Sequence, residues 1–343
     1  MVAQLTGPLL REVSRSFYLS LAVLPASVRP VIGLAYLLAR ATDTVADTRA
    51  VERDARIAAL EALRADLRTD GPGGAEAVAG AFRADQAQPG EGRLLARLPD
   101  CLAAYRALPA ADRERVARLI ETIIDGQAQD LRSFPGDDAD KLEALATRED
   151  LDRYTYLVAG CVGEFWTDVH VAHRPRLAHW DAPAMRALGM RFGQGLQLTN
   201  ILRDVPRDLR QGRCYLPRQD LARLGLAPRD LLDPTAAPAA RPLLVDLLRL
   251  TLERYDAGWQ YTLAIPPTEP RMRLACAWPL LIGLRTLERL AGAAGWLDPA
   301  VRLKVPRPAV YALLARSLVT IWSSRGLARQ ARQLRGRVRI PPA

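Results

Sequence analysis

Apolar residues recur at intervals of three and four along almost the whole of this chain, whereas the alternation typical of strands is nearly absent. In DRERVARLIETIIDGQ one face of an amphipathic helix is formed by Val116, Leu119, Ile120, Ile123 and Ile124. We expect similar helices over residues 27–48, 52–68, 91–107, 149–173, 184–205, 239–262, 269–292 and 307–333. The periodicity therefore predicts an all-α protein.

The connecting stretches are short and rich in Gly, Pro or Asp, which favour turns and loops. They lie near residues 68–77, 85–92, 134–140 and 231–242. None is long enough to separate two domains, so we predict a single domain over residues 1–343, with a basic C-terminal tail from about residue 325. The four cysteines lie far apart and form no CxxC pair, which indicates buried free thiols in a reducing compartment.

The net charge of +10 comes almost entirely from arginine, because Lys141 and Lys304 are the only lysines. The planar guanidinium fork suits phosphate oxygens, so nucleic acid, an anionic membrane and a phosphorylated small substrate are all compatible with it. An arginine-rich helical nucleic-acid-binding protein is the alternative from a different class, but the arginines are scattered and no binding motif is present. We therefore expect no nucleic-acid partner.

Neither a secretory signal nor a membrane span is expected, because the longest uncharged apolar stretches, residues 16–28 and 274–284, are shorter than about 18 residues. We predict a cytoplasmic protein, with a monomer favoured. The tail arginines suit peripheral contact with anionic lipid on the inner face of the cell membrane, although an exposed basic helix end explains them equally well. They are Arg325, Arg329, Arg332 and Arg335.

The first of two acidic motifs lies in YLLARATDTVADT. Asp43 and Asp47 are four residues apart and therefore lie on one face of a helix. Tyr36 and Arg40, seven and three residues before Asp43, project from that same face. The pattern predicts a polar stripe along an otherwise apolar helix.

The second acidic motif repeats this arrangement within LQLTNILRDVPRD. Its polar residues stand at steps of three, four and four, which again makes one stripe on a helix. They are Gln197, Asn200, Asp204 and Asp208.

Pro206 interrupts the second motif. It removes one helix hydrogen bond and disfavours helical backbone at Val205, so we expect the helix to kink or loosen there. A fraying end would turn Asp208 toward a ligand. Gly212 permits a tight turn, which would bring Arg213 back over the same site.

Carboxylates at this spacing, without a neighbouring histidine or cysteine, suit a hard cation such as Mg²⁺, which takes one or two carboxylates plus phosphate oxygens. A single Asp pair at this spacing is more often a solvated helix face. Two such motifs with arginines nearby favour a Mg²⁺-bridged diphosphate site, to which the arginines add charge-assisted hydrogen bonds. These arginines are Arg15, Arg40, Arg203 and Arg213.

His170 and His173 form an HxxH pair, which raises the question of a metal site. No cysteine ligand stands near them, and the spacing is common by chance. We therefore interpret both histidines, together with His179, as residues of a helix surface.

Five stretches of the chain occur in the order found in the squalene and phytoene synthase family, which the chain resembles over about 270 residues. They are SRSFYLSLAVLP (14–25), YLLARATDTVAD (36–47), YTYLVAGCVGEFW (154–166), LQLTNILRDVPRDLRQGRCYLP (196–217) and CAWPLLIGLRTL (276–287). The resemblance implies an all-α, type I isoprenoid synthase bundle around a deep central apolar cavity, with Mg²⁺ bound by two DxxxD motifs.

The resemblance also implies a reaction, the head-to-head joining of two prenyl diphosphates. One allylic diphosphate ionises, the double bond of the other attacks, and a cyclopropyl diphosphate forms. In squalene synthases this intermediate ionises again, rearranges and is quenched by hydride from NADPH. Metal and arginines would stabilise the departing diphosphate, and an apolar cavity would protect the carbocation from water.

Position by position, the resemblance assigns metal binding to Asp43, Asp47, Asp204 and Asp208. It assigns diphosphate binding and orientation to Arg15, Ser16, Tyr36, Arg40, Asn200, Arg203 and Arg213. Phe17 and Gln197 would shape the adjoining pocket. Tyr154 resembles the family tyrosine that handles the proton lost during cyclopropane formation, whereas by its sequence context alone it reads as an amphipathic core residue.

The product is a choice within the family. Many phytoene synthases carry DDxxD, whereas this chain has Thr44 in DTVAD, as eukaryotic-type squalene synthases do. We therefore predict a bacterial type of squalene synthase, which condenses two farnesyl diphosphates through presqualene diphosphate and reduces the product with NADPH. The alternatives are phytoene or dehydrosqualene, presqualene diphosphate and hydroxysqualene as products. No nucleotide motif is present, so NADPH depends on the resemblance alone, with Lys304 and Arg307 as weak candidates for phosphate contact.

Overall fold

The computed structural model describes residues 5–14, 18–69, 73–82 and 88–340. These residues are helical almost throughout and include one small parallel sheet, β1 (Glu143–Ala144) beside β2 (Arg213–Cys214). The predicted all-α class is therefore confirmed. The chain forms two compact units: unit 1 comprises residues 1–132 and 164–182, and unit 2 comprises residues 133–163 and 183–343. That the whole chain acts as one domain around a central cavity remains a prediction.

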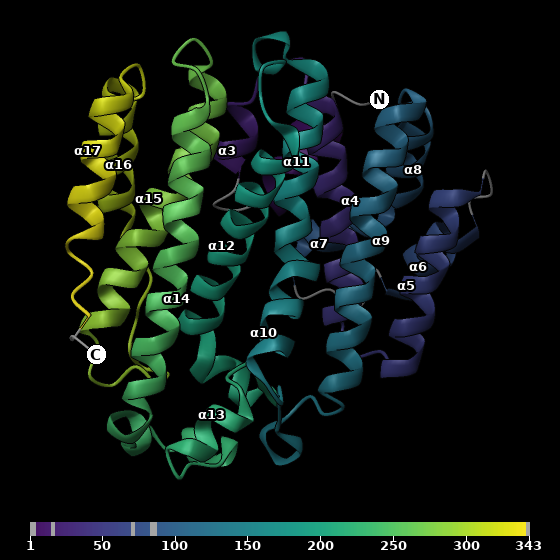
Figure 1. Cartoon of the computed structure of the whole chain (residues 1–343). Coiled ribbons are helices and arrows are strands. Elements are labelled where there is room, and N and C mark those ends of the chain that lie inside the picture. The colour runs from purple at the N-terminus through teal and green to yellow at the C-terminus, as the bar shows by residue number, and fades with distance from the viewer. Residues whose placement is uncertain (1–4, 15–17, 70–72, 83–87, 341–343) are drawn as a thin grey trace. The chain divides into compact units, whose positions relative to one another are not determined.

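Unit 1 contains the helices of the N-terminal part of the chain, drawn from purple to blue in Figure 1, and most of one later helix. In chain order they are η1 (Leu5–Leu9), α2 (Leu10–Val13), α3 (Tyr18–Ala22), α4 (Arg29–Asp47), α5 (Arg53–Arg68), α6 (Gly73–Phe82), α7 (Pro89–Ala96), α8 (Leu98–Arg106), α9 (Ala110–Ser133), α11 (Cys161–His173, in unit 1 from Glu164) and η5 (Pro175–Leu177).

Helix α4 is the central element of unit 1, where it contacts α5, α7 and α8. Most of its residues are buried, which agrees with the apolar run in its sequence. At its C-terminal end the buried Arg56 of α5 donates a hydrogen bond from Nη1 to the carbonyl oxygen of Ala46, at 3.1 Å. This contact satisfies one of the carbonyls that the end of a helix leaves without a partner.

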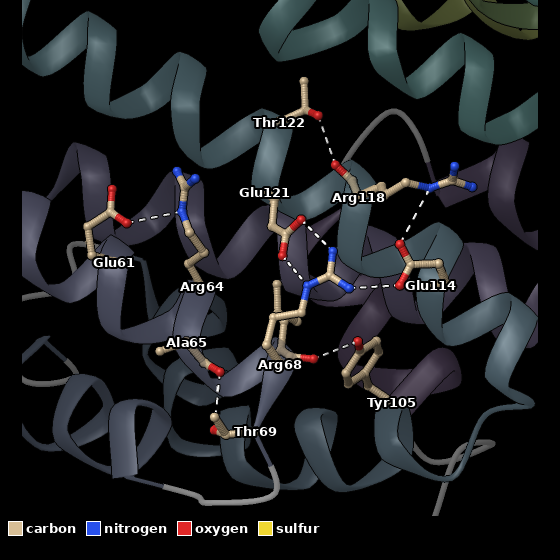
Figure 2. A network of polar contacts seen from close by, with 11 residues as sticks. Glu61, Arg64, Ala65, Arg68, Thr69, Tyr105, Glu114, Arg118, Glu121 and Thr122 are labelled. Atoms are coloured by element: carbon tan, nitrogen blue, oxygen red, sulfur yellow. Dashed lines mark hydrogen bonds and ion pairs between the residues drawn. The ribbon is translucent and has the colours of Figure 1, made fainter.

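Helix α5 is also tied to α9 by a network of charges on the surface of unit 1 (Figure 2). Arg68 lies between two carboxylates of α9, at 2.7 Å from Glu114 and 2.5 Å from Glu121. Tyr105 of α8 donates from its hydroxyl to the carbonyl oxygen of Leu67, at 2.9 Å. The side chain of Arg68 is 45% exposed, so water screens the network and it orients the helices more than it stabilises them.

Helix α6 was expected to be a loop at its start, and that prediction is wrong. A glycine and a proline directly precede it in the sequence, and two more glycines follow, which favours a turn, but α6 begins at Gly73. The buried Asp66 of α5 accepts the backbone N–H groups of Gly74 and Ala75, at 3.2 and 2.7 Å. A carboxylate from another helix thus caps the N-terminus, a role that local sequence does not reveal.

The HxxH histidines are placed differently from our expectation of a helix surface. His170 of α11 is completely buried, whereas His173 is partly exposed and lies 2.9 Å from both carboxylate oxygens of Asp112. His179 is exposed, as predicted. The spacing therefore does not mark a metal site, because one histidine is in the core and the other is hydrogen-bonded to Asp112.

Unit 2 contains the remaining elements, drawn from teal to yellow in Figure 1. In chain order the elements are η3 (Ala139–Lys141), β1, α10 (Arg148–Thr155), η4 (Tyr156–Gly160), α12 (Ala182–Arg210, in unit 2 from Pro183), β2, α13 (Arg218–Arg223), η6 (Pro228–Leu232), η7 (Pro234–Ala236), α14 (Ala237–Ala264), α15 (Pro270–Gly292), α16 (Arg307–Thr320) and α17 (Ser324–Arg335).

The last two helices were predicted as one, over residues 307–333. The chain instead turns after Thr320, and α17 begins at Ser324 with the Ser323 hydroxyl accepting the N–H of Gly326. The buried Arg273 of α15 donates to the carbonyl oxygens of Ile265 and Ile321, both at 2.8 Å. One guanidinium thereby caps the ends of both α14 and α16 and fixes the turn.

The expectations for the cysteines and for membrane-spanning helices can be compared with the described residues. All four cysteines are free and buried, as predicted. Within the described ranges, no helix is both long enough and apolar enough to cross a membrane.

Candidate active site

In unit 1 the polar stripe of the first acidic motif is the accessible face of α4. From Val31 to Ala46 every residue is buried except four. These are Tyr36, Ala39, Arg40 and Asp43, and Asp47 continues the same face as an exposed residue. The prediction that these side chains share one face is therefore confirmed.

Asp43 has a partner that the sequence analysis did not identify. Gln127 of α9 is buried and donates from Nε2 to Asp43 Oδ1 at 2.6 Å, and to the hydroxyl of Thr42 at 3.1 Å. The amide therefore fixes the orientation of the carboxylate from a second helix. A signal was present, since Gln127 follows Ile123 and Ile124 on the apolar face of its predicted helix, where a polar side chain needs a partner.

The charge environment of Asp43 is unusual for an aspartate. Its side chain keeps 48% of its surface exposed, yet protein atoms crowd the carboxyl closely enough to raise its pKa to about 6. Loss of hydration is the main cause; Asp47 adds to it, while Arg40 and Gln127 oppose it. A divalent cation beside the carboxylate would favour the ionised form, so this setting fits a cation site.

Arg40 is held by acidic partners in unit 1. It forms a short ion pair with Glu91 of α7 and lies 3.9 Å from Asp43. Glu91, which the sequence analysis also missed, has only 14% of its side chain exposed and therefore orients the guanidinium firmly. Arg40 is thus positioned at the accessible face, as predicted.

Thr44 lies at the buried edge beside this face, four residues after Arg40. It is buried, and its hydroxyl donates to the carbonyl oxygen of Arg40 at 2.8 Å. A threonine at this position therefore leaves the accessible carboxylates unchanged.

In unit 2 the second polar stripe is a partly exposed face of the C-terminal half of α12. Leu198, Ile201, Leu202, Val205 and Leu209 are buried on one side. The other side is partly exposed and contains the predicted residues Gln197, Asn200, Arg203, Asp204 and Asp208. The second stripe is therefore also confirmed.

Arg203 and Asp204 form a bidentate ion pair within this stripe. Arg203 Nε lies 2.8 Å from Asp204 Oδ1, and Nη2 contacts the other carboxylate oxygen. Both side chains are 30% exposed, so the pair can be reached by a ligand. The guanidinium that was predicted to hold a diphosphate is here paired with the neighbouring carboxylate.

Our expectation that α12 kinks or frays at Pro206 to release Asp208 is wrong in its second part. The helix continues past Pro206 and ends at Arg210, so Asp208 lies within the last helical turn. Its place beside Asp204 follows from the four-residue spacing alone. Arg210 Nη1 donates to the carbonyl oxygen of Pro206 at 2.6 Å, which helps to complete hydrogen bonding at this end.

The turn after α12 is as tight as predicted. Gly212 has a φ of +77°, and a Cβ atom there would lie 2.7 Å from the carbonyl oxygen of Asp138. Glycine is required on both counts. The turn leads into β2, where Arg213 pairs in register with Glu143 of β1, so its backbone is fixed by the sheet.

Tyr154 belongs to an aromatic cluster in unit 2. Its ring stacks on that of Tyr215, with the centroids 4.7 Å apart, and the two hydroxyls lie 3.3 Å from each other. Phe134 meets Tyr215 edge to face at 5.1 Å. Tyr215 lies in the GRCYLP stretch that carries the resemblance, but the sequence did not indicate that it contacts Tyr154.

The segment that carries Tyr154 is fixed directly to α12. A Cβ atom at Gly193 would lie 2.1 Å from the carbonyl oxygen of Ala159, so the two backbones touch only because glycine lacks one. Gln194 donates from Nε2 to the side chain of Asp152 at 3.1 Å. These contacts join the segment of Tyr154 to α12 within unit 2.

Some predicted site residues are not brought into these clusters. Arg15, Ser16 and Phe17 lie outside the described residues. Lys304 and Arg307, the candidates for NADPH, are exposed and lie in the segment between α15 and α16 and at the first position of α16.

The donor set of the two stripes can be tested against Mg²⁺. In the part of the chain that the structure describes, no three His, Cys, Asp or Glu side chains are grouped closely enough to hold a metal by themselves. Each stripe instead offers two carboxylates, an all-oxygen set without histidine or cysteine. This fits the way Mg²⁺ binds through one or two carboxylates and completes its shell with phosphate oxygens and water.

Comparison with known proteins agrees with this fold. The profile of the family described as Squalene/phytoene synthase matches residues 10–309. The chain therefore belongs to the squalene/phytoene synthase family, whose members are head-to-head prenyltransferases.

Individual members of the family share less than a third of their residues with this chain. The chain is 29% identical to a presqualene diphosphate synthase of Zymomonas mobilis over 310 residues, 90% of each protein. It is 28% identical to a phytoene synthase of Mycobacterium tuberculosis over 276 residues, 80% of this chain and 76% of that protein. A structure of TcSQS with the ligand BPH1237 superposes with a TM-score of 0.79 at 20% identity, covering 98% of this chain and 91% of the other. The isoprenoid synthase fold is thereby confirmed.

Proposed function

We propose that this protein catalyses the Mg²⁺-dependent head-to-head condensation of two farnesyl diphosphates to presqualene diphosphate. The observation that carries the proposal is that each acidic motif places its two aspartates on one accessible face of a helix whose opposite face is buried. Two such faces, with oxygen donors and arginines beside them, suit Mg²⁺ and a diphosphate. The likeness over 90% of each chain to a presqualene diphosphate synthase supports this product.

The carboxylates would hold Mg²⁺ against the diphosphates, with Asp43 and Asp47 in one motif and Asp204 and Asp208 in the other. Bound Mg²⁺ would supply positive charge to the leaving diphosphate. Arg203 would turn part of its hydrogen bonding from Asp204 to a phosphate oxygen, which the fork geometry of a guanidinium permits. Gln127 keeps Asp43 aimed while this exchange takes place.

Tyr154 would take part in proton removal when the cyclopropane ring closes. At that step a C–H bond breaks, its electron pair forms the third ring bond, and the proton must leave. The hydroxyl contact between Tyr154 and Tyr215 provides a second oxygen to which a proton can pass. Both rings also offer electron-rich faces that favour a nearby cation.

A second candidate function is the further reduction of presqualene diphosphate to squalene with NADPH. The YLVAGCVG and CAWP stretches favour this reading because they resemble squalene synthases. Lys304 and Arg307 are exposed and available to the phosphates of the cofactor. Thr44, which also favoured squalene, contributes less to the choice now that its side chain is seen to be buried.

The deciding experiment is incubation of the purified chain with farnesyl diphosphate and Mg²⁺, with and without NADPH, followed by mass spectrometry of the lipid extract. Presqualene diphosphate in both reactions supports the main proposal. Squalene that forms only with NADPH supports the second candidate. Geranylgeranyl diphosphate run in parallel tests chain length, and a product from it alone would replace the proposed substrate. Absence of any condensed product with either substrate would refute the proposal.

A further inference from the structure

Helix α16 is apolar on all sides, yet almost none of it is buried. Only Ser317 of its 14 residues is buried, and only Arg307 and Arg316 are charged. A helix of this composition normally lies in the interior of a protein, because leaving its apolar side chains in water is unfavourable. A binding partner that covers its outer face would therefore be favourable.

The large exposed side chains of this region form a continuous stripe. Tyr311, Leu318 and Trp322 follow at steps of seven and four, which places them on one side of the helix and of the turn that follows it. They are 63%, 52% and 63% exposed, and the adjacent Val319 is 78% exposed. Isolated apolar residues on a surface are common, but a group of this size marks an interaction site.

The stripe is held in a fixed orientation. Trp278 of α15 donates from Nε1 to the hydroxyl of Ser317 at 2.8 Å, so the one buried residue of α16 is anchored by a hydrogen bond. Arg273 caps the end of the helix at Ile321, beside Trp322. These contacts lie on the inner side and leave the outer side open.

The segment that includes α16 and α17, residues 299–343, accounts for all of the net positive charge of the chain. Residues 299–343 include ten arginines and lysines and no aspartate or glutamate, and the remaining 38 basic residues of the chain balance its 38 acidic residues. Such a one-sided distribution creates a local positive field, whereas the rest of the chain is neutral as a whole. The segment therefore favours an anionic partner.

The charges of α17 are arranged to meet that partner. Leu327, Ala331 and Leu334 are buried, and the opposite side of the helix is exposed. That exposed side contains Arg325, Arg329 and Arg332. Arg335, by contrast, forms a bidentate ion pair with Asp256 of α14 at 2.8 Å. It therefore joins α17 to α14 and is less available for lipid contact than we expected.

Taken together, these features lead us to propose that the outer face of α16, with the arginines of α17 beside it, docks on an anionic membrane surface. Tyr311, Leu318, Val319 and Trp322 enter the boundary between headgroups and acyl chains, where aromatic side chains are favoured. Arg325, Arg329 and Arg332 bind the lipid phosphates. Charge alone would also suit nucleic acid, but an apolar stripe within a basic segment matches a lipid surface, which is both anionic and apolar.

The test uses the full chain and vesicles of one part phosphatidylglycerol to two parts phosphatidylcholine, with vesicles of phosphatidylcholine alone for comparison. We expect co-sedimentation with the anionic vesicles, at least roughly tenfold stronger than with the neutral ones and weakened by salt. The measurement requires no turnover, so its result is separate from the success or failure of the proposed reaction.

Two triple variants separate the apolar and charged contributions. Leu318→Ser, Val319→Ser and Trp322→Ser together should weaken binding at least about tenfold. The matched control is Leu19→Ser with Val162→Ser, the two large exposed apolar residues outside this segment among those described. It should bind like the wild type.

The charge variant is Arg325→Gln, Arg329→Gln and Arg332→Gln, for which we expect binding on the order of 100-fold weaker. Its control removes the same charge elsewhere through Arg118→Gln, Arg223→Gln and Arg229→Gln, whose side chains are 61%, 73% and 58% exposed. Unchanged helical circular dichroism checks that each variant is folded.

Three outcomes would overturn the proposal. The first is a wild-type protein that does not co-sediment with anionic vesicles but binds duplex DNA. The second is an apolar triple variant that binds vesicles as well as the wild type. The third is a concentration-dependent dimer that the apolar variant dissociates, without vesicle binding, which would make a second copy of the chain the partner of α16.

Discussion

Helix α4 of unit 1 and helix α12 of unit 2 both bury one side and leave a stripe with two aspartates accessible, but they hold these aspartates differently. Asp43 accepts a hydrogen bond from the neutral amide of Gln127, whereas Asp204 is bound by both nitrogens of the Arg203 fork. The charge of Asp204 is therefore already balanced, while that of Asp43 is only partly offset by Arg40 at 3.9 Å. One spacing in the sequence thus yields two electrostatic settings.

This difference suggests a division of labour within the proposed reaction. An aspartate whose negative charge is only partly offset attracts a cation by itself. Because surrounding protein disfavours its ionised form, a bound cation would stabilise that form. An aspartate paired with arginine brings its own positive charge, which can be shared with an incoming phosphate. We therefore expect α4 to govern the demand for Mg²⁺ and α12 to govern the affinity for diphosphate.

The largest expected effect tests whether both motifs bind metal at all. Asp43→Asn and Asp204→Asn should each lower turnover roughly 100- to 1,000-fold, since each removes a charged ligand without changing shape. Product formation from farnesyl diphosphate measures this, and Asp54→Asn, at an exposed aspartate with 85% of its side chain accessible, is the control. Wild-type turnover in one of the two variants would show that only the other motif binds the cation.

The second prediction contrasts the two units in acid. All three histidines of the chain lie in unit 1, and burial lowers the pKa of His170 to about 4. Its ring therefore stays neutral in the folded state, with Nδ1 at 2.8 Å from the carbonyl oxygen of Trp166. The unfolded chain binds a proton there below about pH 6.5, so His170 alone lowers the free energy of unfolding by ~3 kcal/mol as the pH drops from 6.5 to 4. Asp43, whose pKa is raised to about 6 in the folded state, acts in the opposite direction over part of this range, so the contribution of His170 must be measured as a difference between variants.

Urea unfolding measured from pH 7 to pH 4 tests this sign. Relative to the wild type, His170→Gln should be ~3 kcal/mol more stable at pH 4 than its difference from the wild type at pH 7 indicates, because glutamine does not titrate. His179→Gln, at an exposed histidine, should show no such relative gain. A His170→Gln variant whose stability follows the same pH dependence as the wild type would contradict the assignment of a neutral, buried His170.

Much of the fold and site could be read from the sequence because the signals were local. The helical period locates α4 and α12, and steps of three and four residues place the Asp43 and Asp204 stripes on accessible faces. The turn at Gly212 could be predicted for a similar reason, because glycine is the residue that most readily adopts a positive φ.

What the sequence could not supply depends on contacts between distant segments. Helix α6 begins at glycine because Asp66 of another helix caps it. Gln127 and Asp43 stand 84 positions apart, and the stacking of Tyr154 on Tyr215 joins residues 61 positions apart. The split of residues 307–333 into two helices likewise depends on Arg273, which caps the turn from α15.

The third prediction concerns the fork on α12. Arg203→Lys keeps the charge but loses the two parallel hydrogen bonds to Asp204, so we expect KM for the diphosphate substrate to rise roughly 10- to 100-fold. Arg40→Lys should have a smaller effect, because its main partner is Glu91 and its contact with Asp43 is loose. Arg191→Lys, at an exposed position of α12, is the control. Equal effects of the two site variants would remove the distinction between the helices.

The smallest expected effect isolates the neutral donor on α9. Gln127→Leu removes the hydrogen bond that opposes the raised pKa of Asp43, so the carboxylate should bind Mg²⁺ more weakly and the Mg²⁺ concentration for half-maximal turnover should rise about tenfold. Turnover at saturating Mg²⁺ should stay close to the wild-type value. Thr42→Val removes only the second anchor of the amide, at 3.1 Å, and should raise that concentration less. A Gln127→Leu variant that instead lowers turnover at every Mg²⁺ concentration would show that Gln127 supports the packing of α4 and not the affinity of Asp43 for the cation.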